Sequence, residues 1–462
     1  MVFSSILFLF VYLPVVLAVY YIAPVRFRNV WLFIVNLVFY GWGEPVYILL
    51  MIFSITLNYA AGLLIAKYRE NDIKKAKAVL TVNTVVNLAL LVFFKYFDLF
   101  TETINAILGT NIATLGLTLP IGISFYTFQT MSYPIDVYRG DTDAQKNYIR
   151  FGTFVALFPQ LIAGPIVRYK DVASQLGARK LSTEQFSSGV QRFVVGLGKK
   201  VLIANNIGAL WDVYSSASEL SFAGAWLGAI AFSLQLYFDF SGYSDMAIGL
   251  GRMIGFEFLE NFNYPYISKS VTEFWRRWHM SLGTWFRDYL YIPLGGNRRG
   301  LPRQILNILI VWALTGLWHG ANWTFLMWGL YYAVFLIIEK VFLLKRLEKV
   351  PVIAHIYAIL VAVVGWMLFQ LDSVGEVVRY WGAMFGAGGV FATAADAYNA
   401  KSYAVILIIA AIAATPLPKA LFAKLPEKVR SAAAPVLVAL CLIASTAYLV
   451  DATYNPFLYF RF

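Results

Sequence analysis

Apolar runs long enough to cross a membrane recur along the whole chain, and they constrain its fold more than any other feature. A hydrocarbon layer roughly 30 Å thick is crossed by a helix of about 20 apolar residues. Of the 462 residues, 60% are hydrophobic and only 13% are charged, which excludes an ordinary water-soluble domain. The candidate spans are residues 4–22, 29–42, 45–66, 78–97, 120–138, 201–217, 222–240, 303–318, 320–339, 351–371, 402–418 and 434–450.

The sequence therefore predicts an all-α polytopic membrane protein with about twelve transmembrane helices. The formal charge of +12 comes from short clusters between apolar runs, with no long basic stretch that would indicate nucleic-acid binding. The positive-inside rule places these clusters in cytoplasmic loops and the N-terminus outside. The clusters comprise Arg26, Arg28, Lys67, Arg69, Lys74, Lys75, Lys77, Lys340, Lys345, Arg346, Lys349, Lys419, Lys424, Lys428 and Arg430.

Two stretches, residues 151–200 and 241–302, interrupt this pattern by mixing aromatic residues with charges, glycines and prolines. In the first, residues 158–165 (FPQLIAGP) break helical hydrogen bonding. In the second, residues 274–279 (FWRRWH) and 285–289 (WFRDY) interleave aromatics and cations, as interfacial helices do. We expect re-entrant and interfacial amphipathic helices in both stretches, and a plain membrane anchor is the alternative for the second.

The whole chain, residues 1–462, is predicted to form a single membrane domain, because no repeat and no Pro/Ser-rich linker divides it. The first apolar run lacks a basic leader and a small-residue cleavage signature, so we expect it to be retained as a span. The single cysteine, Cys441, excludes an intrachain disulfide.

The three histidines are the candidates for proton transfer. His319 lies where two predicted spans meet, with Gly316 and Gly320 beside it, so it can sit within the bilayer and still reach water. A pKa near 6.5 makes an imidazole a competent base toward a hydroxyl at neutral pH. For His279 a catalytic role and simple packing are equally open, and His355 is expected to be structural.

Other catalytic chemistries find little support in the sequence. The histidines lack a Cys cluster or a His-Glu-x-x-His helix, so no metal site is predicted. No Gly-x-Ser-x-Gly elbow is present, which disfavours a serine nucleophile and favours direct transfer. A further polar cluster ends the run 222–240 and either lines a polar tunnel or joins helices by hydrogen bonds. Its members include Gln235, Asp239, Ser241 and Tyr243.

Six separate sequence blocks, in order, resemble the membrane-bound O-acyltransferase (MBOAT) family, and within it the alginate O-acetyltransferase branch. The resemblance covers nearly the whole chain. The blocks are residues 119–129 (LPIGISFYTFQ), 159–165 (PQLIAGP), 239–245 (DFSGYSD), 274–279 (FWRRWH), 285–297 (WFRDYLYIPLGGN) and 317–320 (LWHG).

The resemblance implies an MBOAT-like fold around a central tunnel and transfer of an acetyl group from a cytoplasmic thioester, expected to be acetyl-CoA, to a hydroxyl for extracellular polysaccharide O-acetylation. It implies that His319 is the family's essential histidine and that His279 is its second motif histidine. It also implies a secreted or periplasmic SGNH-type partner, the bacterial cytoplasmic membrane as location, and no bound cofactor. Candidate tunnel or donor-binding residues are Trp318, Gln235, Asp239, Ser241, Tyr243, Glu273, Trp275, Arg276, Arg277 and Asp288.

Three other functions are weighed against this one. D-Alanyl transfer to teichoic acid belongs to a related branch, which differs at the continuation 293–299 (PLGGNRR). A transporter or flippase would also use many spans and broken helices, but no inverted repeat is evident. A scaffold for secreted partners would leave His319 dispensable. The acceptor is open among alginate, cellulose or another exopolysaccharide, peptidoglycan and a serine of a partner protein.

Overall fold

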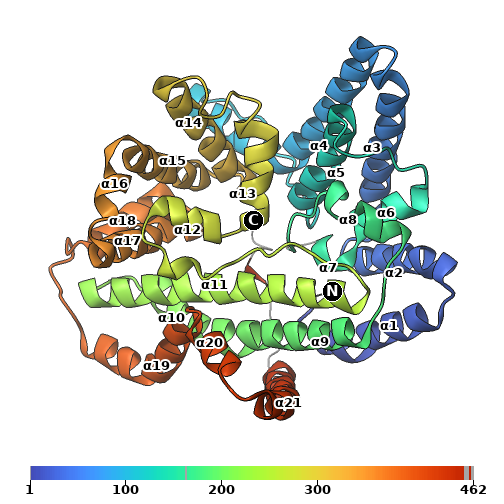
Figure 1. Ribbon diagram of the computed structural model, residues 1–462. Helices are drawn as coiled ribbons and strands as arrows, with labels where there is room; N and C mark the ends of the chain where they lie inside the picture. Colours follow the sequence, from blue (N-terminus) through green and yellow to red (C-terminus); the bar gives the residue numbers. More distant parts are fainter. Residues whose placement is uncertain (1, 162–163, 452–456, 459–462) are drawn as a thin grey trace. The chain divides into compact units, whose positions relative to one another are not determined.

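The structure is a computed structural model that describes residues 2–161, 164–451 and 457–458. Every regular element among these residues is helical (Figure 1), which confirms the all-α prediction. Eight of the described helices are long and apolar enough to cross a membrane, and the run Phe8–Ile22 is a shorter apolar helix. The chain is therefore a multi-pass membrane protein, whereas the count of about twelve spans stays a prediction.

Two predicted spans correspond to helices shorter than these eight. The span 29–42 is α2 (Arg28–Gly43), and the span 120–138 is α5 (Ile123–Arg139), with 16 and 17 residues. Such lengths lie at or below the lower limit for crossing a bilayer without tilt or thinning. Buried polar side chains further reduce the hydropathy of α5.

Residues 183–200 belong to a long helical run, although we expected re-entrant or interfacial structure throughout the stretch 151–200. Helix α9 (Thr183–Gly198) continues through a π-helical turn at Lys199–Ala204 into α10 (Asn205–Ser215). Together they make a helical run of 33 residues. We expected an interruption partly because this stretch contains glycines. The Cα of Gly189 instead faces the carbonyl of Gly249, so this glycine allows close packing and does not break the helix.

In the second stretch, residues 241–253 are likewise part of a long helix, α11 (Phe222–Met253). The other helices of the two stretches are short. The first contains α6 (Tyr148–Ala156), α7 (Phe158–Leu161) and α8 (Tyr169–Gly177), and the second contains α12 (Val271–Arg277) and α13 (Met280–Phe286). None of these five exceeds 9 residues, which is about half the length required to span a bilayer. Within the predicted break 158–165, residues 162 and 163 lie outside the described residues.

The chain divides into two compact units. Unit 1 comprises Met1–Phe193 and Asp245–Leu259. A helical hairpin of α3 (Ile48–Arg69) and α4 (Ile73–Leu108) packs beside α5. Its two helices are joined by a buried carboxamide network, in which Asn58 donates to Asn87 at 3.1 Å and Asn83 donates to Asn58 at 3.0 Å. Such interhelical hydrogen bonds hold membrane helices together.

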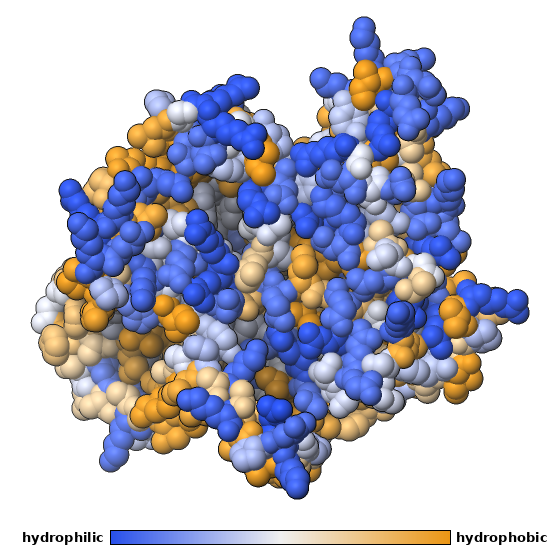
Figure 2. Space-filling model, in the orientation of Figure 1, coloured by the Kyte–Doolittle hydropathy of each residue, from blue (hydrophilic) through white to orange (hydrophobic). Residues whose placement is uncertain are grey.

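The free end of the α3–α4 hairpin is polar. Figure 2 shows hydrophilic side chains gathered there, where the turn carries the predicted cytoplasmic cluster of residues 67–77. Asp72 caps α4 by accepting a hydrogen bond from the Lys75 N–H at 3.1 Å. The second helix of the hairpin, α4, therefore begins at a capped, charged turn. The positive-inside rule predicts such a basic turn for a cytoplasmic loop.

Unit 2 comprises Val194–Ser244 and Glu260–Phe462. In this unit α14 (Leu301–His319) packs closely against α15 (Trp323–Ile338), where Gly316 and Gly329 let the two backbones touch. The other helices are α11 (Phe222–Met253, whose end belongs to unit 1), α16 (Leu344–Leu347), α17 (Pro351–Gln370), α18 (Val374–Met384), α19 (Ala394–Ala413), α20 (Leu417–Ala423) and α21 (Glu427–Asp451). In unit 1, α1 (Leu13–Ile22) precedes α2.

Candidate active site

His319 is the last residue of α14 and is buried, with 4% of its surface exposed. The chain turns directly after it, at Gly320, where a Cβ atom would collide with the ring of Phe325. The imidazole lies edge-on against Trp328 and Phe369, with ring centroids 5.0 and 5.3 Å apart. The tight turn and the aromatic packing together fix the ring at the end of a helix.

His279 lies in the link between α12 and α13 and is 2% exposed. Its φ of 44° is in the left-handed region, which a non-glycine residue adopts only when its surroundings impose it. The Nδ1 atom is 3.1 Å from Oδ1 of Asn261, and the ring contacts Phe240 at a centroid distance of 4.8 Å. The residue lies outside the eight candidate spans, and burial lowers its pKa to about 3, so the ring is neutral at physiological pH.

Both histidines line one cavity of about 280 Å³ within unit 2. One wall is a face of α14 whose residues are spaced by three or four positions, as on one side of a helix. These residues are Ile308, Val311, Trp312, Thr315 and His319. At a rise of 1.5 Å per residue, this wall is about 16 Å long.

The cavity also reaches two exposed cations. The side chain of Arg287 is 60% exposed, Lys340 is exposed, and both line the cavity together with Trp275. Cations at exposed positions and imidazoles at buried ones suit a ligand with an anionic head and a long, less polar arm. Such a ligand would present its reactive end to the histidines.

Both predicted tryptophans, Trp275 and Trp318, belong to this site. Trp275 lines the cavity, and its ring packs on Trp312 at a centroid distance of 4.8 Å. Trp318 contacts the rings of both His279 and His319, with centroid distances of 6.1 and 4.9 Å. The structure thus brings together the two predicted histidines and two of the predicted tunnel residues.

The predicted charged residues near α12 and α13 are instead engaged in local contacts. Arg277 pairs with Glu273, with Nη2 to Oε1 at 2.8 Å, and Asp288 pairs with Arg287, with Oδ1 to Nε at 2.8 Å. Arg276 is exposed. Of these five, only Arg287 lines the cavity, and the predicted donor-binding set did not include it.

The polar cluster of α11 forms a second buried group in unit 2, and none of its members lines the cavity. Asp239 pairs with Lys200, with Oδ1 to Nζ at 2.5 Å, and also accepts a hydrogen bond from the Leu458 N–H at 2.9 Å. Tyr243 packs on Phe457 at a centroid distance of 4.7 Å. Gln235 and Ser241, the other two predicted members, lie on the same helix, α11. The ion pair and the contacts with residues 457 and 458 give Asp239 and Tyr243 structural partners, and a tunnel role for the cluster stays a prediction.

Besides Arg287, sequence reasoning missed three residues that shape the site. Asn261 contacts His279, Lys340 lines the cavity, and the carboxylate of Glu339 accepts hydrogen bonds from the first two backbone N–H groups of α12 at 2.6 and 2.8 Å. Lys340 was assigned only to a topological cluster. Glu339 carried a detectable signal, because a carboxylate inside an apolar run is costly unless it has partners. Asn261 carried none.

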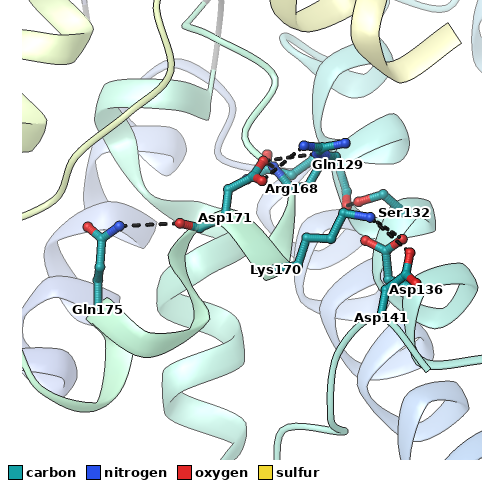
Figure 3. Close-up of polar contacts among 8 residues, drawn as sticks. All are labelled: Gln129, Ser132, Asp136, Asp141, Arg168, Lys170, Asp171 and Gln175. Carbon is teal, nitrogen blue, oxygen red and sulfur yellow. Dashed lines mark hydrogen bonds and ion pairs between the residues drawn. The ribbon is translucent and has the colours of Figure 1, made fainter. Parts of the chain in front are cut away.

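Unit 1 contains an ion-pair network between α5 and the start of α8 (Figure 3). Lys170 contacts both Asp136 and Asp141, at 3.0 and 3.1 Å, and Arg168 contacts Asp171 at 3.0 Å. The pair of Lys170 with Asp136 joins α8 to α5 and provides the buried carboxylate with a cation. Among the described residues, no group of three or more His, Cys, Asp or Glu side chains could hold a metal ion.

Comparison with known proteins agrees with the chemistry of the cavity. Residues 142–370, which include both histidines, match the model of the membrane-bound O-acyltransferase family. A probable alginate O-acetylase AlgI of Pseudomonas putida is 40% identical over 100% of both chains. The corresponding protein of Azotobacter vinelandii is 45% identical over 84% of this chain and 79% of its own length.

A peptidoglycan O-acetyltransferase of Helicobacter pylori is 34% identical over 84% of this chain and 81% of its own length. These relatives match on most of their length, and their names share one reaction type although their polymers differ. The chain therefore belongs to the membrane-bound O-acyltransferase family and is an integral, multi-pass O-acetyltransferase.

Proposed function

We propose that the protein moves an acetyl group from a cytoplasmic thioester, acetyl-CoA, to a hydroxyl used for O-acetylation of an extracellular polysaccharide of the alginate type. The observation that carries this proposal is the single cavity that joins exposed cations to two buried histidines. The relatives named as alginate O-acetylases support the choice of polymer.

The donor enters from the side of Lys340, which belongs to a basic cluster that the positive-inside rule places in the cytoplasm. Arg287 and Lys340 bind the phosphates of the donor, and exposed Arg276 adds to the positive potential. The slender arm of the donor lies along the face of α14 between Ile308 and His319. This places the thioester next to the imidazoles.

His319 acts as the general base. It removes the proton of the acceptor hydroxyl while the oxygen attacks the thioester carbonyl. The C–O bond forms, the C–S bond breaks, and the proton passes from His319 to the leaving thiolate. Trp318 and Trp328 hold the ring in place, and His279 is its companion at the cavity wall.

The acceptor hydroxyl is presented from outside, and a secreted or periplasmic SGNH-type partner completes delivery to the polymer. This arrangement assigns the protein to the bacterial cytoplasmic membrane. It also explains why an acetyl donor made inside the cell can modify a polymer outside it.

Replacing His319 with Ala tests the assignment. Purified protein in lipid nanodiscs should lose both release of CoA thiol and transfer of radiolabelled acetyl to alginate oligosaccharides, with unchanged expression and melting temperature. His355→Ala is the matched control, since Nδ1 of this third histidine lies 3.1 Å from the backbone carbonyl of Ser268 and the residue is outside the cavity lining. Normal transfer by the His319 variant would refute the proposal.

The donor assignment has its own test. Lys340→Ala and Arg287→Ala should raise KM for acetyl-CoA and leave KM unchanged for a short acetyl thioester that lacks phosphates. An equal effect on both thioesters would contradict phosphate binding by these cations.

A further inference from the structure

A short backbone pairing brackets His279 and imposes its left-handed conformation. The Met280 N–H donates to the Asn261 carbonyl at 3.0 Å, and the Asn263 N–H donates to the Arg277 carbonyl at 2.9 Å. These two bonds join residues 261–263 to the chain on both sides of His279, whose φ is 44°. The strained backbone is thus held by its neighbours, as is typical of residues whose orientation serves a function.

The orientation of the Asn261 side chain follows from its partners. Its Oδ1 atom is 3.3 Å from the backbone N–H of Ser281, which can only donate, and 2.9 Å from the Ser281 hydroxyl. Its Nδ2 atom donates to the hydroxyl of Ser244 at 3.0 Å. An exchange of the two amide atoms would set an NH₂ group against a backbone N–H, so the atom near His279 is the oxygen.

An oxygen at this place determines which imidazole nitrogen carries the proton. Oδ1 of Asn261 accepts, so Nδ1 of His279, 3.1 Å away, must donate, and in a neutral ring Nε2 then has the lone pair. Both side chains are almost fully buried, at 1% and 2% exposure, and the pKa of His279 is well below neutrality. The ring therefore keeps this tautomer at physiological pH.

We infer that Asn261 is a positioning residue that fixes His279 as the Nδ1–H tautomer, so that His279 offers the cavity a hydrogen-bond acceptor. A thioester carbonyl or the oxyanion formed from it has no proton to share, so His279 does not stabilise either of them. The group that it binds is a hydrogen-bond donor: an amide N–H of the donor's arm or the acceptor hydroxyl. This second part rests on the proposed function, whereas the tautomer does not.

The tautomer is tested without any reaction. The chain has three histidines, so selective ¹⁵N-histidine labelling gives three ring systems, and single His→Gln variants assign them. At pH 7 we expect His279 to carry its proton on Nδ1, and Asn261→Leu to shift it toward Nε2. Ser244→Ala is the matched control, because it removes a partner of the amide nitrogen and leaves the oxygen in place. An Nε2–H ring or an imidazolium in the wild-type protein would overturn the inference.

Kinetics then identify the bound group. Asn261→Leu should lower kcat/KM for transfer by roughly 10- to 100-fold, the range found when an outer partner of a functional histidine is removed. Asn261→Asp, whose oxygen still accepts from Nδ1–H, should recover most of this loss. If Asn261→Leu raises KM for acetyl-CoA in the absence of acceptor, the group bound by His279 is the amide of the donor's arm. If the defect is confined to transfer, the bound group is the acceptor hydroxyl. Unchanged kinetics in the Leu variant would refute the role of His279 as an acceptor. The tautomer result would stand apart from that outcome.

Discussion

The contact between α14 and α15 should tolerate no side chain at Gly316. A Cβ atom there would overlap the carbonyl oxygen of Phe325 and lie 3.0 Å from its carbonyl carbon and 3.3 Å from the Cα of Gly329. These neighbours are backbone atoms of a second helix and cannot rotate away. Gly316→Ala must therefore push the helices apart or shift one along the other.

The expected cost follows from two opposed effects. Alanine gains up to about 1 kcal/mol over glycine in a helix interior. Overpacking of a close contact costs about 1–3 kcal/mol, and the upper end applies because backbone meets backbone here. The net destabilisation is on the order of 2 kcal/mol. His319 lies three residues further along α14, and a shift of about 1 Å at a catalytic group can lower the rate by 10²-fold.

Thermal unfolding in nanodiscs and acetyl transfer measure the two consequences. Gly316→Ala should lower both the melting temperature and kcat. Gly329→Ala should do the same, because its Cβ would meet the Trp312 carbonyl. Gly375→Ala in α18 is the control, since the nearest atom would be 3.9 Å away and the helix propensity acts alone. A Gly316→Ala protein with an unchanged melting temperature and kcat within about twofold of wild type would refute the reasoning.

Three further predictions concern ionisable side chains. Glu339→Gln should cost about 1–3 kcal/mol of unfolding free energy and lower transfer, because an NH₂ group would face the N–H donors of α12, which carries Trp275. Lys170→Met removes the cation beside fully buried Asp136 and should lower the free energy of unfolding by several kcal/mol. Asp141→Asn should lower it by less than about 1 kcal/mol, because this carboxylate is exposed. Equal losses of stability in thermal unfolding would contradict this prediction. The pKa of His279 in the folded protein lies below its unfolded value near 6.5, so the unfolded chain binds more protons as the pH falls. Lowering the pH from 7 to 5 should therefore reduce the free energy of unfolding by on the order of 2 kcal/mol. In paired melting curves, the stability of the His279→Gln protein should depend less on pH than that of the wild type.

The sequence predicted the parts of the fold that depend on apolar length and on local motifs. Runs of apolar residues correctly indicated a helical multi-pass protein, and the glycine-flanked position of His319 correctly placed it at the end of a span. His279 could be proposed from its motif, and the structure places both rings at one cavity. Their catalytic roles remain proposals.

The rest depended on contacts between residues distant in sequence. The role of Asn261 arises because a loop 18 positions before His279 folds back onto it, and no local pattern indicates such a pairing. The α11 cluster shows the same dependence on distant contacts. Its sequence left a polar tunnel and hydrogen bonding between helices both open, and in the structure Asp239 pairs with Lys200, 39 positions earlier in the chain. A charge pattern along one helix cannot identify its partner on another.

The aromatic rings around His319 have an electrical consequence. If acetyl groups pass between compartments at this site, the same route could leak protons, and each elementary charge that crossed would dissipate about 2.3 kcal/mol per 100 mV of membrane potential. Trp318, Trp328 and Phe369 pack against the imidazole and leave it 4% exposed. Such packing would let a neutral acetyl group pass from one side of the membrane to the other while it limits the passage of protons.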